Sequence, residues 1–168
     1  MRQSNGGFQN WTDGLKQNII FLDFDGVLVV ASTNFRAADP SCVAVLNQII
    51  KQGEAALVIS STWRLLSPYA NDATLKTIEY LQELLSGWGV DGKVVGLTPH
   101  LTRFHPNSWR GSEINAWLEA NPDAYKNFVI LDDDGDMNPW MSKLVKTEFK
   151  VGLQSHHIEK ALALLCSE

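Results

Sequence analysis

The chain has 168 residues, of which 45% are hydrophobic, and this length is enough to bury the core of one domain. Its net charge of −5 and sequence pI of about 5.3 argue against a dedicated nucleic-acid binder with a broad basic face, but leave room for a local basic patch. No apolar run approaches the ~18 residues needed to span a bilayer, so we expect a cytoplasmic protein without membrane association. The two cysteines, Cys42 and Cys166, lack metal-ligand spacing and indicate free thiols in a reducing compartment.

Residues 1–18 are rich in Gly, Asn and Gln and contain no apolar core of a signal peptide, so we expect a flexible arm. The apolar run that follows predicts a strand at residues 19–24, buried on both faces of a parallel sheet. Because side chains alternate along a strand, Asp23 and Asp25 should emerge on the same side at its C-terminal end. Gly26 then allows the backbone to turn sharply.

The rest of the chain alternates between helical and strand patterns. Asp39 and Pro40 are typical of an N-cap and a first helical residue, and the helix should end at Gly53. A longer helix is predicted to begin near Asp72, with Leu75 in its apolar stripe, and to end at Gly87. The further predicted elements are strands at residues 55–59, 93–97, 128–131 and 144–146, and helices at residues 112–120 and after a cap at Ser155.

This alternation predicts an α/β fold with a doubly wound, mostly parallel sheet, helices on both faces and right-handed crossovers. We expect a single domain over residues 19–168, present as a monomer or a weak homodimer. No connector has enough unassigned sequence to form a separate lid or cap domain. The active site should therefore be open to solvent.

Three of the predicted strands end in polar residues, and the carboxyl ends of parallel strands meet at the edge where ligands bind. Several carboxylates meeting there need a hard divalent cation, and oxygen ligands of this kind suit Mg²⁺. Carboxylates and Mg²⁺ without a thiol or imidazole cluster indicate phosphate chemistry, in which a carboxylate can be the nucleophile and a second one the general acid and base. A hydroxyl from Ser60 and a cation from Arg110 can hold the phosphoryl oxygens. The polar residues at the three strand ends are Asp23 and Asp25, Ser60 and Ser61, and Asp132 and Asp133.

Together these patterns resemble the haloacid dehalogenase (HAD) superfamily of phosphotransferases. Its four motifs are a strand ending in D-x-D-G, a strand ending in Ser or Thr, a Lys or Arg near a helix start, and a strand ending in an acidic pair. Here they read FLDFDGVL, LVISSTWR, SWRGSEI and VILDDDGDM, in the family order, over roughly residues 19–137. The second Asp of the first motif is similar to the phosphatase branch, so the resemblance implies a Mg²⁺-dependent phosphatase.

The resemblance also implies a role for each matching residue. Asp23 would be the nucleophile that forms an aspartyl-phosphate, and Asp25 would be the general acid and base, with its backbone carbonyl on Mg²⁺. Ser60 would bind the phosphoryl group. Arg110 would lie where the family usually has Lys and would neutralise charge as a planar fork rather than as a point charge. The metal site would be completed by Asp132 and Asp133.

A narrower resemblance concerns the segments SSTWR, RGSEINAWL and GLQSHHIEKALALL. They are similar to the HAD domain of Swiss Army Knife RNA repair proteins, a branch similar in theme to the phosphatase half of polynucleotide kinase-phosphatase. The implied substrate is a terminal phosphate on an RNA or DNA end, or on a nucleotide. An open site agrees with this, because it admits a polymer end, whereas a closed lid favours small metabolites.

The residues around the predicted site support two interpretations each. Gly26, Ser61, Arg64 and Arg103 are candidate substrate-binding residues. Ser61 is equally suited to capping the next segment, and Arg64 to a structural pair with the acidic edge. Arg103 is also compatible with a solvated loop, as are His100 and His105. Trp63 and Trp109 are candidates either for packing or for stacking on a base.

Two other functions are compatible with these motifs. A small-metabolite phosphatase or nucleotidase would use the same site and chemistry. A non-catalytic phospho-acceptor or binding domain would keep the fold without turnover. A response-regulator receiver is disfavoured, because its acceptor Asp follows a later strand than its acidic pair, and the order here differs.

Overall fold

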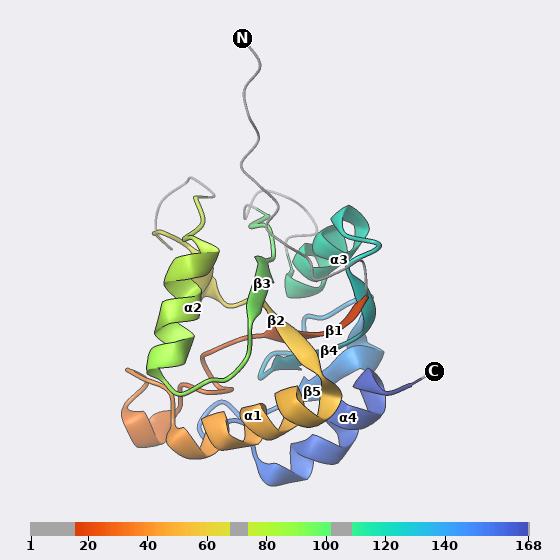
Figure 1. Cartoon of the computed structure of the whole chain (residues 1–168). Helices are drawn as coiled ribbons and strands as arrows, with labels where there is room; N and C mark the ends of the chain where they lie inside the picture. Colours follow the sequence, from red (N-terminus) through yellow and green to blue (C-terminus); the bar gives the residue numbers. More distant parts are fainter. Residues whose placement is uncertain (1–15, 68–73, 102–108, 168) are drawn as a thin grey trace.

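The computed structural model describes residues 16–67, 74–101 and 109–167. The strands in these ranges are β1 (Gln17–Leu22), β2 (Ala55–Ile59), β3 (Val94–Leu97), β4 (Tyr125–Asp132) and β5 (Leu144–Lys146). They pair in parallel as one sheet with the order β3-β2-β1-β4-β5 (Figure 1). The predicted parallel sheet is therefore confirmed.

Helices cover both faces of this sheet. Those described are α1 (Pro40–Gly53), α2 (Ile78–Gly87), α3 (Arg110–Ala120) and α4 (Ile158–Leu165). α1, α2 and α4 share one hydrophobic core with Leu22 and Leu57 of the sheet, whereas α3 packs with Phe21 and Val58 on the opposite face. Figure 1 shows α1 and α4 together below the sheet and α3 on its other side. This arrangement confirms the predicted doubly wound α/β architecture.

The central strand β1 is held by burial of both its faces. Its last four side chains, from Ile19 to Leu22, are all 0% exposed. Burying a large apolar side chain of this kind contributes about 1.5–3 kcal/mol relative to leaving it exposed. A continuous apolar run is therefore stable only at the centre of the sheet, where β2 and β4 cover its two edges.

The first helix begins and ends as its sequence predicts. The Asp39 carboxylate accepts a hydrogen bond of 2.7 Å from the backbone N–H of Ser41, and Pro40 is the first helical residue. Gly53 is the last helical residue, and Glu54 follows in the left-handed conformation with a φ of 47°. The strands predicted at residues 55–59 and 144–146 are confirmed with the same bounds.

Three predicted helix starts are wrong, one of them by two residues, since α3 begins at Arg110 rather than at residue 112. α2 begins at Ile78, because the Thr77 hydroxyl caps it by accepting from the Tyr80 N–H at 3.1 Å, and Leu75 instead pairs with Leu65 in an isolated bridge. Asp72, where this helix was expected to begin, lies outside the described residues.

At the start of the last helical region, a short 3-10 turn, Ser155–His157, precedes α4. It is capped by Gln154 rather than by Ser155, since the His157 Nδ1 accepts from the Gln154 N–H at 2.9 Å.

The boundary of the N-terminal arm also differs from the prediction. β1 begins at Gln17, so Gln17 and Asn18 belong to the sheet, and the Asn18 amide donates to the carbonyl of Gly53 at 2.8 Å. The remainder of the predicted arm, residues 1–15, lies outside the described part of the chain. None of the described helices is long and apolar enough to cross a membrane.

Candidate active site

The strand registers place the predicted site residues in one row across the sheet. β1 pairs with β2 and β4 so that the residue after its end, Asp23, lies between Ser60 and Asp132. Backbone hydrogen bonds of 3.1 Å continue both ladders through Asp23 and Ser60. Because register partners on parallel strands point to the same face, these three side chains share the face that α3 covers.

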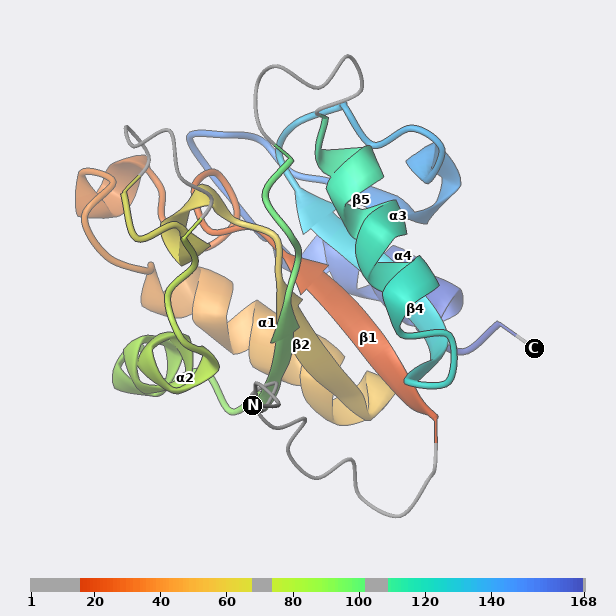
Figure 2. The ribbon, with the colours of Figure 1, turned by 90° about the horizontal axis from the view of Figure 1, so that it is seen from above.

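This row lies where the chain reverses its direction across the sheet. From β1 the chain proceeds outward to β2 and β3, and then returns to β4 on the other side of β1. Ligands of open α/β sheets bind at such a switch point, beyond the carboxyl ends of the strands. Figure 2 shows β1 and β4 running side by side in the same direction, with the first turn of α3 near their ends.

An acidic cluster occupies this position. Asp23, Asp132 and Asp133 each offer a carboxylate oxygen, and these atoms lie within 4.8 Å of one another. Burial and the neighbouring Asp23 charge raise the pKa of Asp132 to about 8. Burial also raises the pKa of Asp23, although Arg110 acts in the opposite direction, and burial together with Asp23 raises the pKa of Asp133. The three carboxylates therefore resist simultaneous ionisation unless a cation joins them.

The donor set fits a hard divalent cation. All three ligand atoms are carboxylate oxygens, the type that Mg²⁺ prefers. Asp132 Oδ2 is buried and has no hydrogen-bond partner among the described residues. A buried carboxylate oxygen without a partner is costly, and a metal ion at this position would satisfy it.

The turn after β1 requires a glycine. Gly26 has a φ of +75°, and a Cβ at this position would lie 2.6 Å from Asp133 Cγ. Its carbonyl accepts a hydrogen bond of 2.6 Å from the Thr147 hydroxyl. The absence of a side chain thus lets the Asp133 carboxylate approach the first loop, while the substrate contact of Gly26 stays a prediction.

Arg110 is the first residue of α3 and reaches the acidic cluster. Its Nη1 lies 3.5 Å from Asp23 Oδ1, its Nε lies 4.0 Å from Asp132 Oδ2, and Nη1 also donates to the carbonyl of Ser60. Burial lowers the pKa of Arg110, but the Asp23 and Asp132 charges outweigh it and the net pKa is raised. Its charge is therefore retained beside the predicted nucleophile.

The start of α3 is held against the acidic loop. The Asp136 carboxylate accepts from the Arg110 N–H at 3.2 Å, and the Asp136 carbonyl accepts from the Gly111 N–H at 3.0 Å. A Cβ on Gly111 would lie 2.1 Å from the carbonyl oxygen of Asn138, so only glycine permits this approach. The acidic motif that follows β4 thus positions Arg110, the arginine of the SWRGSEI motif.

Buried hydroxyls lie on the other side of Asp23. Ser60 is 0% exposed, and its hydroxyl has no partner in the described part of the chain. Ser61 hydrogen-bonds the Asp23 carboxylate and also caps the next turn, accepting from the Trp63 N–H at 3.3 Å. The capping interpretation of Ser61 therefore has a counterpart in the structure, and its contact with substrate stays a prediction.

Thr98 continues the row of strand-end residues that contains Asp23 and Ser60, and it was not predicted from the sequence as a site residue. It follows β3 as Ser60 follows β2, is 0% exposed, and its hydroxyl has no partner among the described residues. Its place directly after the predicted strand at residues 93–97 was a usable signal, since it repeats the pattern of Ser60.

Asp25 does not join the acidic cluster but is oriented by a tryptophan. The Trp63 indole N–H donates to Asp25 Oδ2 at 2.9 Å. The Trp63 ring packs edge-on against Phe24 and Trp88, with centroid distances of 5.8 and 5.5 Å. Trp63 is therefore a packing residue that positions Asp25, rather than a base-stacking platform. Trp109, in contrast, is 49% exposed directly before Arg110.

The prediction that Arg64 binds substrate is wrong. Its side chain is 1% exposed and donates to four backbone carbonyls that follow β2 and β3. It also pairs with the buried Glu113 carboxylate of α3 at 2.7 Å. With these donors engaged inside the protein, Arg64 has the structural role that was its alternative.

The remaining loop predictions have different outcomes. His100 Nδ1 lies 3.3 Å from Glu113 Oε1, so His100 belongs to the network of Arg64. Arg103 and His105 lie outside the described residues.

A parallel α/β sheet whose first strand ends in Asp-x-Asp-Gly, followed by a buried Ser, a helix-start Arg and an acidic strand end, defines a domain of the HAD superfamily. Residues 19–158 match the model of a family described as the HAD domain in Swiss Army Knife RNA repair proteins, and the chain belongs to this family. A search of curated proteins and a search of solved structures found no significant match. The family confirms the predicted resemblance and indicates hydrolase chemistry of the phosphatase type.

Proposed function

We propose that the protein is a Mg²⁺-dependent phosphomonoester hydrolase that acts through an aspartyl-phosphate on terminal phosphates of nucleic acid or of nucleotides. The observation that carries this proposal is the position of Asp23. It is a buried carboxylate at the switch point of the sheet, 3.5 Å from the Arg110 guanidinium and within 4.8 Å of two further carboxylates.

Asp23, Asp132 and Asp133 would hold Mg²⁺, with the backbone carbonyl of Asp25 as a further ligand. When bound, the ion supplies positive charge that offsets the repulsion of the carboxylates and polarises the phosphoryl oxygens. The raised pKa values of all three carboxyl groups support a cation at this position.

The covalent steps use two carboxylates of the chain. The Asp23 carboxylate attacks phosphorus, the ester P–O bond breaks, and Asp25 gives its proton to the departing oxygen. Asp25 then takes a proton from water, which attacks the phosphorus of the aspartyl-phosphate and releases inorganic phosphate and free Asp23. The 2.9 Å hydrogen bond from Trp63 supports this role, because it fixes the orientation of the Asp25 carboxylate.

The transferred phosphoryl group would be held by donors on both sides of Asp23. Arg110 supplies a fixed positive charge, and the hydroxyl of Ser60 is a buried donor without a protein partner among the described residues. Thr98 offers a second such hydroxyl in the same row. Donors that are already oriented stabilise the charge of the transition state without further rearrangement.

The substrate class rests on the family and on the openness of the site. The family description names RNA repair proteins. The described connectors at the carboxyl edge contain only short 3-10 turns and isolated bridges, and none forms a separate cap domain there. A polymer end can approach such an edge, and the exposed Trp109 ring beside Arg110 offers a surface for a base.

The test is phosphate release with Mg²⁺ from a substrate panel, with Asp23→Asn as the blank. The panel pairs 3′- and 5′-phosphorylated oligonucleotides with mononucleotides, sugar phosphates and an aryl phosphate. Preferential release from oligonucleotide ends is the expected result. A preference for small esters would assign the same site to metabolite hydrolysis, and no release from any substrate would contradict an enzymatic function.

A further inference from the structure

Two aromatic rings stack on the surface away from the hydrophobic core. Phe35 and Phe149 have a centroid distance of 4.8 Å and an interplanar angle of 14°, and their residues are 37% and 50% exposed. The core aromatic pairs, in contrast, meet edge to face at 62–88°. Both residues are therefore partly exposed to solvent, and neither belongs to the hydrophobic cores on the two faces of the sheet.

The backbone holds Phe35 in an uncommon conformation. Asn34 and Phe35 have φ angles of 52° and 53°, in the left-handed region that bulky residues rarely adopt. The turn is fixed by hydrogen bonds from the N–H groups of Asn34 and Phe35 to the carbonyls of Ala31 and Val30, at 3.0 Å each. Such strain at an exposed side chain points to a role outside folding.

The stack adjoins the candidate active site. Phe149 follows Thr147 by two residues, so their Cα atoms are at most about 7 Å apart, and the Thr147 hydroxyl bonds the Gly26 carbonyl at 2.6 Å. The Ala31 N–H donates to the Lys150 carbonyl at 3.2 Å and joins the two segments that carry the rings.

Exposed cations accompany the rings, although the chain is acidic overall. Arg36 and Lys150 directly follow Phe35 and Phe149 in sequence. Lys146 pairs in register with Asp132, is exposed, and precedes Phe149 by three residues. One acidic side chain, Glu148, lies within the same segment.

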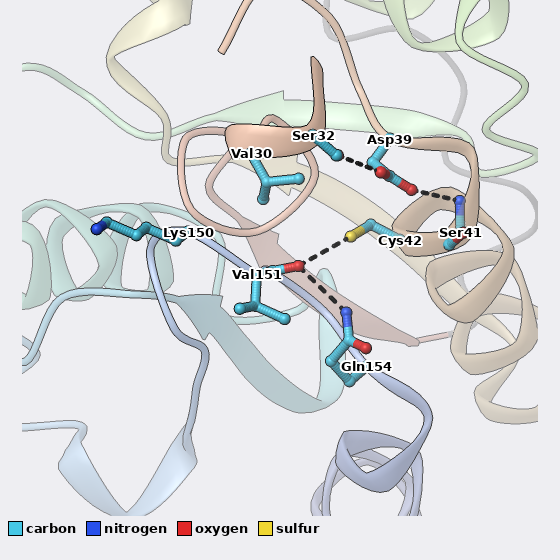
Figure 3. Close-up of a pocket in the computed structure, with 8 residues that line it drawn as sticks. All are labelled: Val30, Ser32, Asp39, Ser41, Cys42, Lys150, Val151 and Gln154. Atoms are coloured by element: carbon cyan, nitrogen blue, oxygen red, sulfur yellow. Dashed lines mark hydrogen bonds between the residues drawn. The ribbon is translucent and has the colours of Figure 1, made fainter. Parts of the chain in front are cut away.

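A pocket of about 310 Å³, lined in part by Lys150 and Val151, lies beside the residues that follow Phe149. Figure 3 shows the Val151 carbonyl opposite Cys42, whereas the Lys150 side chain extends away from Ser32 and Asp39. The Asp39 carboxylate, which accepts from Ser32, disfavours a phosphate inside the pocket. Phosphate contacts are therefore expected from the exposed cations, and the pocket suits an uncharged base edge.

We propose that the stacked rings of Phe35 and Phe149 form a platform for a base of single-stranded nucleic acid whose terminal phosphate lies at Asp23. This inference rests on the proposed function and extends it to the substrate class. Flat aromatic surface combined with cations is the composition that single-stranded nucleic acid recognises, because every base has a face to stack and every linkage a charge. A protein partner would use the apolar area but would not need the cations.

The test measures binding separately from turnover. Short single-stranded RNA and DNA with a terminal phosphate and a fluorescent label are titrated into Asp23→Asn protein, with and without Phe149→Leu. Phe149→Leu keeps an apolar side chain but removes the ring, and should weaken binding by about fivefold to a hundredfold. Phe149→Trp should bind at least as tightly as Phe149. Tyr80→Leu, which removes a comparably exposed ring from α2, should change nothing.

Salt dependence tests the cations. For a single strand, the slope of log affinity against log salt should become shallower by ~0.7 for each charge that Arg36→Gln or Lys150→Gln removes from the phosphate backbone. Unchanged binding of the oligonucleotides by Phe149→Leu would overturn the platform. The platform would also be overturned if Phe149→Leu changed only the self-association of the protein and not its binding of nucleic acid. Hydrolysis of an aryl phosphate by the protein with Asp23 in place tests the proposed phosphatase function separately. The loss of that function and the absence of a base-stacking platform therefore give different results.

Discussion

Two groups of buried charges lie side by side in this molecule and differ in how they are satisfied. The guanidinium of Arg64 donates to four carbonyls and to the Glu113 carboxylate at 2.7 Å, so that its charge is compensated inside the protein. The acidic cluster around Asp23 instead gathers like charges, and Asp132 Oδ2, 4.0 Å from the Arg110 Nε, has no hydrogen-bond partner among the described residues. The first group is typical of a structural contact between elements, and the second is typical of a ligand-binding site.

Two arginines with similar sequence surroundings differ in whether their charge is compensated by the protein itself. Arg64 and Arg110 both lie within a motif of the site and directly follow a Trp, yet one joins the ends of β2 and β3 to α3 and the other points at Asp23. Burial alone does not distinguish them. The distinction comes from whether each polar atom already has a partner within the protein.

The largest expected effect is on turnover in Asp23→Asn. Loss of the nucleophile should lower kcat by about 10⁴- to 10⁶-fold, as for other covalent catalysts. Because one of the crowded buried charges is removed, the melting temperature should stay unchanged or rise. Steady-state hydrolysis of an aryl phosphate and thermal unfolding check the two parts, and a variant that keeps its activity would show that Asp23 is not the nucleophile.

Asp25→Asn should have the next largest effect, which depends on the leaving group. General acid–base catalysis contributes about 10²- to 10⁴-fold, and an alkyl ester needs a proton on its departing oxygen more than an aryl ester does. The ratio of the aryl to the alkyl kcat/KM value should therefore rise in the variant. Equal losses on both esters would argue against the role of Asp25 as the acid.

Arg64→Met tests the compensated group and should act on stability. It leaves Glu113 buried without its partner, and breaking a buried pair in this way costs about 3–5 kcal/mol. Urea unfolding measures the loss. Arg64→Lys is the matched control, which keeps the charge but cannot reproduce the fork of hydrogen bonds, and it should recover only part of the stability. An Arg64→Met protein of normal stability but weaker substrate binding would restore the rejected substrate-binding role.

A smaller effect is expected from pH in the metal-free protein. The pKa of Asp132 is raised from 3.8 to about 8, so the folded state binds its proton more tightly than the unfolded state does. Between these values the contribution of this group to stability falls as pH rises, because folding then opposes ionisation. Thermal unfolding with a chelator should show this fall, and Asp132→Asn should reduce it. A slope unaffected by Asp132→Asn would contradict the assignment.

Much of the fold could be predicted because its signals are local. Apolar runs, the Asp39-Pro40 start and glycines at helix ends indicate elements within a few residues of themselves. The acidic strand ends were predictable for the same reason, since parallel strands bring their carboxyl ends together.

The rest depended on contacts between distant segments. Arg64 and Glu113 are 49 residues apart, and Trp63 and Asp25 are 38 apart, so neither pairing has a local pattern. The start of α2 was predicted too early because Leu75 fits a helical stripe but pairs with Leu65 across the loop. In each case a tertiary contact decided between two locally acceptable structures.

The most direct test of the proposed mechanism is to trap phosphate on the protein. An aryl phosphate, whose departing oxygen depends little on protonation by Asp25, is mixed with the protein and Mg²⁺, the reaction is acid-quenched within the first turnovers, and peptides are examined by mass spectrometry. We expect a phosphate on Asp23, more of it in Asp25→Asn because water activation is slowed, and none in Asp23→Asn. Turnover without phosphate on Asp23, or phosphate on another residue, would contradict a mechanism through an aspartyl-phosphate at this position.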